Sequence, residues 1–403
     1  MKKKISFFIR AYNDLDCRMP LILSFAGDSR FEVSLISYPT NNGFYDIENY
    51  ENFQLIKKNN NIKLINSMLY KNNNIIFLFL YYLNHFLQNF LFKKINFSKS
   101  NKIFFHFFRF FEKFLITYNK KNFQLLKSVI KNSTIILDDI ILDMNRSDFL
   151  SKILELKLHR KIISIQTGQD TYIDLNRSKK SNLIKRKELI VDKFLVPSMN
   201  DKRVFKSLNI KNNITVVGNT RFEKNWIRKL NTKSKRLKIN NQKNNIVFML
   251  SKIEYGVDVS KLIRTIESFA KIKNTLIIIK PHTRGMNIDS IIRKLKYPNI
   301  LNGLYMDSSS LIKWSNIVCF TGSSIIFQAM ILGKKCIFLK NCLNSKSIFD
   351  KSSAMIKINH YKEVDDSIHI KNSKKYIDSF LKRHLYNNKN GRENIIQIKK
   401  YCA

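Results

Sequence analysis

The chain has 403 residues, 44% of them hydrophobic, with only ten glycines and five prolines. This length exceeds a single ordinary core and predicts two domains of about 200 residues each. The low glycine and proline content argues against a linker-rich or disordered protein. The 72 lysine and arginine residues against 30 aspartate and glutamate residues give a net charge of +42. That charge favours anionic partners, whether nucleotides, nucleic acid or an acidic membrane surface, although the AT-rich codons of lysine, asparagine, isoleucine and phenylalanine are an alternative origin for part of it.

The five cysteines are scattered along the chain, and no two of them form a CxxC pair. A zinc site and a disulfide framework are therefore disfavoured, and a reducing cytoplasm is the expected compartment. The first apolar run, Ile5–Ile9, is followed at once by Arg10 and is too short for the hydrophobic region of a signal peptide.

In chain order, the first predicted elements are a strand at Ile5–Ile9, an acidic loop at Asn13–Asp16, a helix at about Arg18–Gly27 and a strand at Glu32–Ser37. An aromatic and basic stretch at about 60–130 follows, and we expect it to be a helical insertion into the first domain.

Two parts of this insertion, Ile75–Phe92 and Ile103–Ile116, are strongly apolar. In each part the polar side chains recur along one stripe of a helix, which predicts amphipathic helices rather than transmembrane spans. Such helices fit a membrane interface. They also fit the simpler role of covering the sheet or each other.

Strands alternate with helices through the rest of the chain. The first set continues at Thr134–Leu137, Lys161–Ile165, Phe194–Val196 and Ile214–Val217, and the second set is Asn245–Leu250, Thr275–Ile279, Ile317–Phe320 and Cys336–Leu339. This alternation predicts an α/β protein with two Rossmann-like, doubly wound domains. We expect an N-terminal domain over 1–218, a C-terminal domain over 219–380, and a helical tail over 381–403 that packs back on the first domain.

Cationic residues follow the predicted strand Thr275–Ile279, in the sequence Lys280-Pro281-His282-Thr283-Arg284. They stand at the carboxyl end of a parallel strand, where open α/β sheets bind ligands. A histidine after an apolar strand is often a core residue. Here the adjacent Lys280 and Arg284 would be costly to bury without a ligand, which favours a binding role for His282.

A second motif runs from Thr321 to Gly333, where a strand is followed by the turn Gly322-Ser323-Ser324 and then an apolar helix. A helix that opens on a small-residue turn offers unpaired N–H groups and a positive dipole end, which suit a phosphate. Ser323 and Ser324 also fit a helix cap, and the two roles are compatible. We expect the two motifs to lie on neighbouring strand ends and to form a pocket for a nucleoside diphosphate.

The ordered motifs resemble the GT-B glycosyltransferase superfamily. They are most similar to the branch with bacterial capsular and surface-polysaccharide transferases, CDP-glycerol glycerophosphotransferases and UDP-N-acetylglucosamine 2-epimerases. The matching pieces are Asp14-Leu15-Asp16 with Pro20, Val196-Pro197-Ser198, Val217-Gly218-Asn219-Thr220-Arg221-Phe222, Lys280-Pro281-His282, and Ser323-Ser324 with Gln328-Ala329 and Gly333-Lys334. The resemblance implies two Rossmann-like domains that face a cleft.

The resemblance also implies a donor site in the C-terminal domain. Ser323 and Ser324 would hold the donor phosphates, while Lys280 and His282 neutralise the leaving nucleotide without a metal or other cofactor. Gln328 stands where relatives often carry a glutamate that binds the donor ribose. The other residues expected at the donor site are Arg284, Gly322, Gly218, Asn219, Arg221, Ser251 and Lys252.

A general base is needed on the acceptor side. Some relatives carry a His-Gly pair where this chain has Gln166-Thr167-Gly168, so the sequence offers no histidine there. The remaining candidates are the carboxylates Asp14, Asp16 and Asp170. Aspartates after a first strand often cap the next helix instead. Gln166, Gly168 and Asp170 are the residues expected to line the acceptor side.

These expectations describe a cytoplasmic glycosyltransferase, peripheral at the inner face of the membrane. It would move a sugar from a nucleotide-activated donor to a saccharide or lipid-linked acceptor in surface-polysaccharide or lipopolysaccharide synthesis. A sugar-nucleotide 2-epimerase is the nearest alternative, and Gln166 and Gln328 also suggest a noncatalytic relative. Specific nucleic-acid binding rests on charge alone, because the chain has no RNA-binding signature, zinc motif or basic helix.

Overall fold

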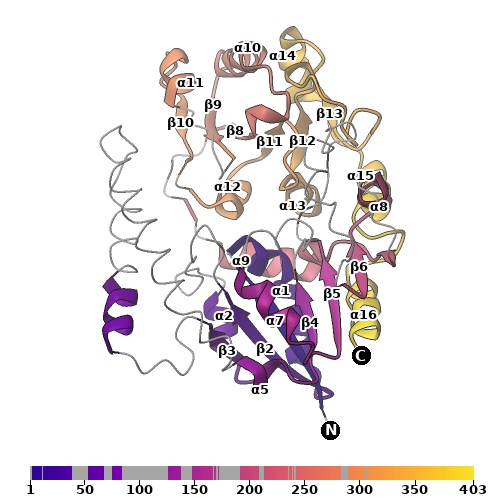
Figure 1. Ribbon diagram of the computed structural model, residues 1–403. Helices are drawn as coiled ribbons and strands as arrows, with labels where there is room; N and C mark the ends of the chain where they lie inside the picture. The colour runs from indigo at the N-terminus through magenta and orange to yellow at the C-terminus, as the bar shows by residue number, and fades with distance from the viewer. Residues whose placement is uncertain are drawn as a thin grey trace.

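The structure is a computed structural model, and two parallel sheets with flanking helices organise it (Figure 1). The residues that it describes are 2–10, 12–38, 53–67, 75–83, 126–137, 148–166, 168, 171, 191–207, 213–234, 236–237, 239, 242–282, 289–304 and 306–403. The first sheet lies below the second in Figure 1, and this arrangement confirms the predicted α/β class with two Rossmann-like domains.

The first sheet has the strand order β3-β2-β1-β4-β5-β6-β7, and every pairing in it is parallel. Its strands are almost fully buried, because helices cover both faces of a parallel sheet. The strands are β1 (Lys3–Ile9), β2 (Phe31–Ser37), β3 (Ile62–Asn66), β4 (Thr134–Leu137), β5 (Lys161–Ile165), β6 (Lys193–Val196) and β7 (Ile214–Val216). The helices are α1 (Tyr12–Ala26), α2 (Phe53–Lys57), α5 (Lys127–Ile130), α7 (Asp148–Glu155) and α8 (Met199–Ser207).

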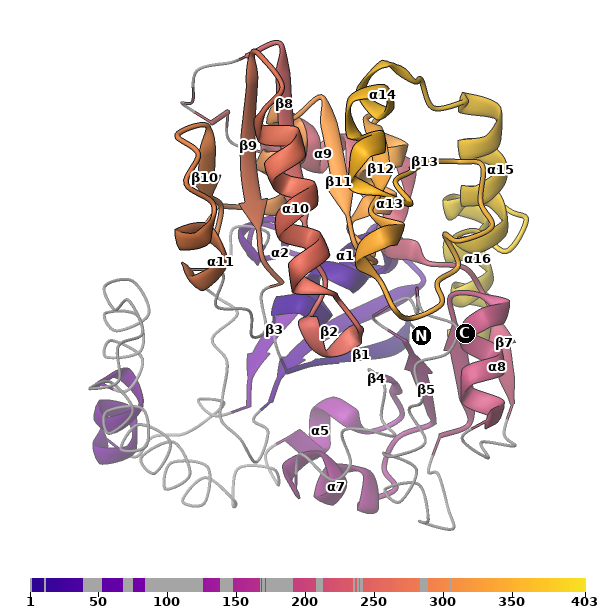
Figure 2. The same cartoon turned by 90° about the horizontal axis from the view of Figure 1, so that it is seen from above.

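The second sheet has the order β10-β9-β8-β11-β12-β13, again with parallel pairings throughout. Its strands are β8 (Asn244–Met249), β9 (Thr275–Lys280), β10 (Ile300–Asn302), β11 (Ile317–Phe320), β12 (Lys335–Phe338) and β13 (Ile356–Lys357). Its helices are α9 (Lys224–Lys233), α10 (Val259–Ala270), α11 (Asp289–Lys294), α12 (Ser308–Trp314), α13 (Ile326–Ile331) and α14 (Val364–His369). Figure 2 shows α10 lying along the sheet, and Phe269 of this helix packs edge-on against Phe248 of β8.

Each sheet reverses its strand order once, between β1 and β4 in the first sheet and between β8 and β11 in the second. The loops that leave the two strands at such a reversal run to opposite faces of the sheet. The space between them is where doubly wound proteins bind ligands. In the second sheet these loops begin at Leu250 and Thr321.

Two predicted elements differ in the structure. Helix α1 begins at Tyr12, so Asp14 and Asp16 lie in its first turns and not in a loop. The Asp14 carboxylate accepts a hydrogen bond from the backbone N–H of Arg10 at 3.3 Å, and a carboxylate in the first turn is favoured by the helix dipole. Strand β3 lies inside the stretch expected to be helical, because Ile62 and Leu64 alternate with polar residues and the segment pairs with β2.

Beyond residue 67, the predicted 60–130 insertion is described only at 75–83 and 126–130, and 75–83 is helical. The predicted helix at Ile103–Ile116 lies outside the described residues. Where the structure describes helices, we find none with the length and apolar character that crossing a bilayer requires.

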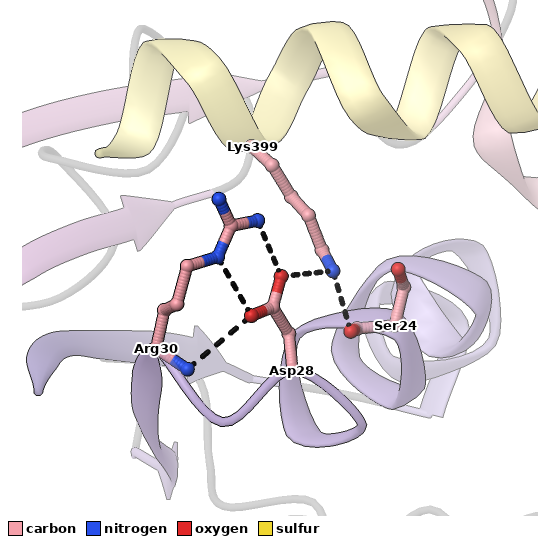
Figure 3. A network of polar contacts seen from close by, with 4 residues as sticks. All are labelled: Ser24, Asp28, Arg30 and Lys399. Carbon is pink, nitrogen blue, oxygen red and sulfur yellow. Dashed lines mark hydrogen bonds and ion pairs between the residues drawn. The ribbon is translucent and has the colours of Figure 1, made fainter.

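The C-terminal helices α15 (Lys374–His384) and α16 (Gly391–Cys402) lead from the second domain back to the first. The ammonium group of Lys399 donates to the Ser24 carbonyl at 2.7 Å and lies 3.0 Å from the Asp28 carboxylate (Figure 3). The last turn of α16 is also bonded to the first sheet, since the Thr134 hydroxyl donates to the Cys402 carbonyl at 3.1 Å.

The Asp28 cluster predicts acid-sensitive anchoring of α16. Hydrogen bonds from Arg30, and then from Lys399, hold the pKa of Asp28 well below its usual value. Its stabilising effect should therefore be complete above the unfolded pKa of about 4 and decline as the pH falls below it. We expect the melting temperature of wild type to exceed that of Asp28→Asn at neutral pH, and this difference to shrink in acid. A difference that stays constant down to the acid limit of folding would contradict the assignment.

Candidate functional site

The turn after β11 carries a row of unused backbone donors. Gly322 has φ 138°, a conformation that a side chain rarely permits, and α13 begins only at Ile326. The N–H groups of Gly322, Ser323, Ser324 and Ile325 donate no hydrogen bond to any described residue. No side chain caps α13 at Ile325. Among the described residues, four successive N–H groups are thus without an acceptor at the point where the second sheet reverses its strand order.

A pair of buried hydroxyl groups fixes the base of this turn. The backbone N–H of Ser251 donates to the Thr321 hydroxyl at 2.9 Å, and the hydroxyl groups of the two residues are also 2.9 Å apart. Ser251 follows β8 and Thr321 follows β11, so these bonds join the two loops at the strand reversal. Ser251, which was predicted to line the donor site, therefore holds the turn in place through its contacts with Thr321. The ammonium group of Lys252, next in the chain, lies 5.9 Å from the centre of the Tyr255 ring.

The two motifs expected on neighbouring strand ends are not on adjacent strands. Strand β8 lies between β9 and β11, so the two strand ends are about 10 Å apart. The start of α12 occupies the space beside them. The Lys280 ammonium group donates to the Leu304 carbonyl at 2.7 Å, and the Gln328 amide donates to the Ser309 hydroxyl at 3.0 Å. Lys280 and Gln328 thus both contact the segment that begins α12.

Lys280 is the buried cation of this region. Its side chain is nearly buried, and burial lowers its pKa while the nearby Asp307 carboxylate opposes that shift. His282 follows two residues after β9 and is half-buried. Arg284, the third predicted cation, lies outside the described residues. A desolvated ammonium group interacts more strongly with an added negative charge than a solvated one does.

The loop after β5 brings the first domain onto this turn. The Thr171 hydroxyl donates to the Gly322 carbonyl at 2.6 Å, and the Thr171 carbonyl accepts from the Ser347 hydroxyl at 2.7 Å and from the Ile348 N–H at 2.9 Å. The predicted acceptor-side residue Gly168 belongs to the same loop and is exposed. Thr171, which follows the predicted acceptor-side residues in sequence, is therefore in direct contact with Gly322 of the predicted donor turn.

Gln166 begins this loop, and its side chain is fixed by a buried hydrogen bond. Its amide donates to the Asp201 carboxylate at 2.8 Å, and Asp201 also accepts from the Ser198 hydroxyl. All three side chains are buried. In this structure Gln166 acts as a support for the loop, while Asp170 lies outside the described residues.

The two aspartates of α1 are in different environments. Asp14 is 2% exposed, and its carboxylate lies 3.0 Å from the Arg10 guanidinium. Asp16 is partly exposed and forms an ion pair with Arg221 at 3.0 Å. Phe222, the next residue, packs edge-on against Phe327 of α13 at a centroid distance of 5.4 Å. Asp16 is therefore paired with the segment 220–222, which also packs on α13.

Gly218 and Asn219 connect β7 to the C-terminal tail. Gly218 has φ 80°, and the N–H of Asn219 donates to the Leu385 carbonyl at 2.7 Å. The Asn219 side chain caps the short helix η3 (Thr220–Phe222) by accepting from the Arg221 N–H at 3.1 Å. These contacts tie the segment to the C-terminal tail, and the prediction that it binds the donor stays a prediction.

The predicted site residues did not include Thr171, Asp201 or Ser309, and Ser198 and Thr321 were named only as parts of motifs. Asp307 followed by three serines was a recognisable helix start, and it does cap α12 by accepting from the Ser310 N–H. Thr171 gave no local signal, because its partner Gly322 is 151 residues away. Within the described residues, His, Cys, Asp and Glu side chains form no group of three placed to hold a metal ion.

Solved structures with the same two-domain architecture cover this chain over its whole length. The UDP-GlcNAc 2-epimerase from Neisseria meningitidis bound to UDP-GlcNAc has a TM-score of 0.56 and 14% identity, over 100% of this chain and 99% of that one. The S. aureus MnaA–UDP structure has a TM-score of 0.54 and 11% identity, over 100% and 96%. The UDP-GlcNAc 2-epimerase from Methanocaldococcus jannaschii has a TM-score of 0.53 and 14% identity, over 100% of both chains.

No protein-family model matches this chain, and no curated protein matches it in sequence. The likeness to the solved structures therefore concerns the fold, and its identities of 11 to 14% leave the chemistry to the site itself. The two parallel sheets, the contact of Thr171 with Gly322 and the return of α16 to the first domain give this chain the same two-domain fold as these solved structures.

Proposed function

We propose that the protein is a glycosyltransferase whose second domain binds a nucleotide-activated sugar. The observation that carries this proposal is the row of four unused N–H groups from Gly322 to Ile325 at the strand reversal. Backbone N–H groups in a fixed turn are suited to the oxygens of a diphosphate. The solved structures bound to UDP-GlcNAc and to UDP support a nucleotide-sugar as the ligand for this fold.

The chemistry of the reaction fits this arrangement. Departure of a nucleoside diphosphate places negative charge on the phosphate oxygens, so fixed donors and a nearby cation stabilise the transition state more than the ground state. The turn supplies the donors, and Lys280 and His282 are the proposed cationic partners. In this proposal Gln328 binds the donor ribose through its amide, exchanging its bond to Ser309 for one to the sugar hydroxyl.

Asp16 is the proposed general base for the acceptor hydroxyl. It is partly exposed and pairs with Arg221, whose neighbour Phe222 packs on α13, whereas Asp14 is buried against Arg10. We expect Asp16→Asn to lower turnover by about 10²–10⁴-fold without changing nucleotide affinity. The matched variant Asp14→Asn should lower the melting temperature and retain turnover. A purified Asp16→Asn protein that turns over at the wild-type rate would refute the assignment.

The proposed acceptor is a saccharide or lipid-linked saccharide of surface-polysaccharide or lipopolysaccharide synthesis, and the proposed location is the inner face of the cytoplasmic membrane. The contact of Thr171 with Gly322 supports an acceptor site on the first domain, because Thr171 touches the donor turn only three residues after the exposed Gly168. This loop is the surface of the first domain that such an acceptor would meet.

A sugar-nucleotide 2-epimerase is the second candidate, and the similarity of the fold to solved UDP-GlcNAc 2-epimerases favours it. An epimerase moves the proton at C2 and needs no acceptor, so the two activities differ in their products. We would incubate the protein with UDP-sugars in D₂O, with and without membrane extract, and follow the products by NMR and mass spectrometry. Acceptor-dependent release of the nucleotide supports the transferase. Incorporation of deuterium at C2 in the absence of acceptor would refute the transferase proposal and support the epimerase.

A further inference from the structure

The helix at 75–83 exposes an apolar face. Five large hydrophobic side chains in this helix are exposed, and they make up half of the ten that the described residues expose. They recur at helical spacing along one face: Ile75, Ile76, Phe79, Tyr82 and Leu83. Soluble surfaces rarely gather large apolar side chains in this way without a binding role.

The opposite face of the helix is packed. Phe77 and Tyr81 are buried, and their rings stack with centroids 6.4 Å apart. The Tyr81 hydroxyl accepts from the Asn66 side chain at 3.0 Å, which joins the helix to the end of β3. The helix stands to the side of the first domain, away from the second (the purple helix at the left of Figures 1 and 2). These contacts of Phe77 and Tyr81 therefore determine which face of the helix is exposed.

The sequence around this helix is strongly basic, which favours an anionic partner for the apolar face. The stretch 60–130 contains eleven lysine and arginine residues and a single acidic residue, Glu112. Lys57, Lys58 and Lys63, which precede the helix, are exposed. An apolar face with aromatic side chains, set in a basic stretch, fits the interface of an anionic bilayer. A second copy of the chain fits less well, because both copies would bring the same positive charge to the contact.

We propose that the apolar face at 75–83 inserts into the headgroup region of a bilayer that contains anionic lipid. This inference names the surface by which the protein would bind the membrane. It rests on the proposed function only where it concerns a lipid-linked acceptor. Because this surface belongs to the first domain, it would bring that domain close to an acceptor held in the membrane.

The test is co-sedimentation of the full chain with phosphatidylcholine vesicles, with and without phosphatidylglycerol. No donor or acceptor is present, so failure of the proposed enzymatic function would not affect the result. The test variant is Ile76→Ser with Phe79→Ser. The matched control is Ile370→Ser with Tyr376→Ser, two side chains that are about half exposed in the second domain. Emission from Phe79→Trp, measured with the same vesicles, reports whether position 79 enters the bilayer.

We expect wild type to partition onto the anionic vesicles, the Ile76/Phe79 variant to lose at least about tenfold in partitioning, and the control to retain it. The emission of Phe79→Trp should shift to the blue on binding. Equal binding of wild type and the Ile76/Phe79 variant would overturn the proposal, and so would an absence of binding to anionic vesicles. A wild-type dimer that this variant converts to monomer, without vesicle binding, would assign the face to self-association instead.

Discussion

Replacing Ser324 by proline is expected to weaken nucleoside-diphosphate binding by about ten- to a hundredfold in a protein that still folds. The Ser324 N–H donates no hydrogen bond to the described residues, so its removal breaks none of their bonds. The Ile326 N–H bonds to the Ser323 carbonyl and closes a turn in which Ser324 is the second residue, a position that accepts proline. Losing one hydrogen bond to a charged phosphate costs about 1.5–3 kcal/mol, which corresponds to that change in affinity.

Ser324→Ala is the matched control for this prediction. It removes the hydroxyl group and keeps the N–H, so its affinity should stay within a few fold of wild type. If the hydroxyl is the phosphate ligand, the order reverses, and alanine weakens binding as much as proline does. Isothermal titration with the preferred nucleotide separates these outcomes, and far-UV circular dichroism shows whether the proline variant is folded.

Gly218→Ala is expected to destabilise the protein by about 2–5 kcal/mol. Gly218 has φ 80°, which costs an alanine about 1–2 kcal/mol. An added Cβ would also lie 2.0 Å from the Asn394 amide nitrogen and 2.9 Å from the Leu385 carbonyl oxygen. Asn394 is fully buried and the carbonyl belongs to the backbone, so neither moves freely, and overpacking adds about 1–3 kcal/mol. The free energy of unfolding, measured in urea, tests this.

Gly333→Ala provides the control for backbone conformation. Gly333 has φ 70°, close to that of Gly218, but an added Cβ there meets nothing within 4 Å. Its substitution should therefore cost only the left-handed term, about 1–2 kcal/mol. Equal losses at the two glycines would mean that the tail does not pack tightly on the Gly218 turn. The difference between them measures that packing.

Long apolar runs were sufficient to predict the central strands. Ile5–Ile9 and Thr275–Ile279 consist mostly of β-branched and aromatic residues, as is typical of buried parallel strands. Two edge strands, β3 and β13, were not predicted, because they lack such runs. Strand β3 at Ile62–Asn66 contains a lysine and ends in asparagine, and β13 has only two residues. The start of α1 was placed too late, because acidic residues between a strand and a helix match both a loop and a first helical turn.

The site was predictable only in its local parts. The turn Gly322-Ser323-Ser324 can be recognised in the sequence, because small residues stand between a predicted strand and a predicted helix. The strand order that separates β9 from β11, and the contact of Thr171 with Gly322, arise from the tertiary fold and have no signature in a single stretch of sequence. The partners of Lys280 and Gln328 on the segment beginning α12 are likewise long-range contacts. Residue types indicated which chemistry the site could support, but they did not indicate which residues would lie close together.

The most direct test of the central claim is a titration of the purified protein with UDP, CDP, CMP and GDP, followed by thermal unfolding. Wild type, His282→Ala and Ser324→Pro would be measured side by side. A site for a nucleoside diphosphate on the turn after β11 predicts saturable stabilisation of wild type by one of the diphosphates, which rises with the logarithm of its concentration. Both variants should lose most of this stabilisation. Stabilisation of Ser324→Pro equal to that of wild type, or no stabilisation of wild type by any of the four, would contradict the account.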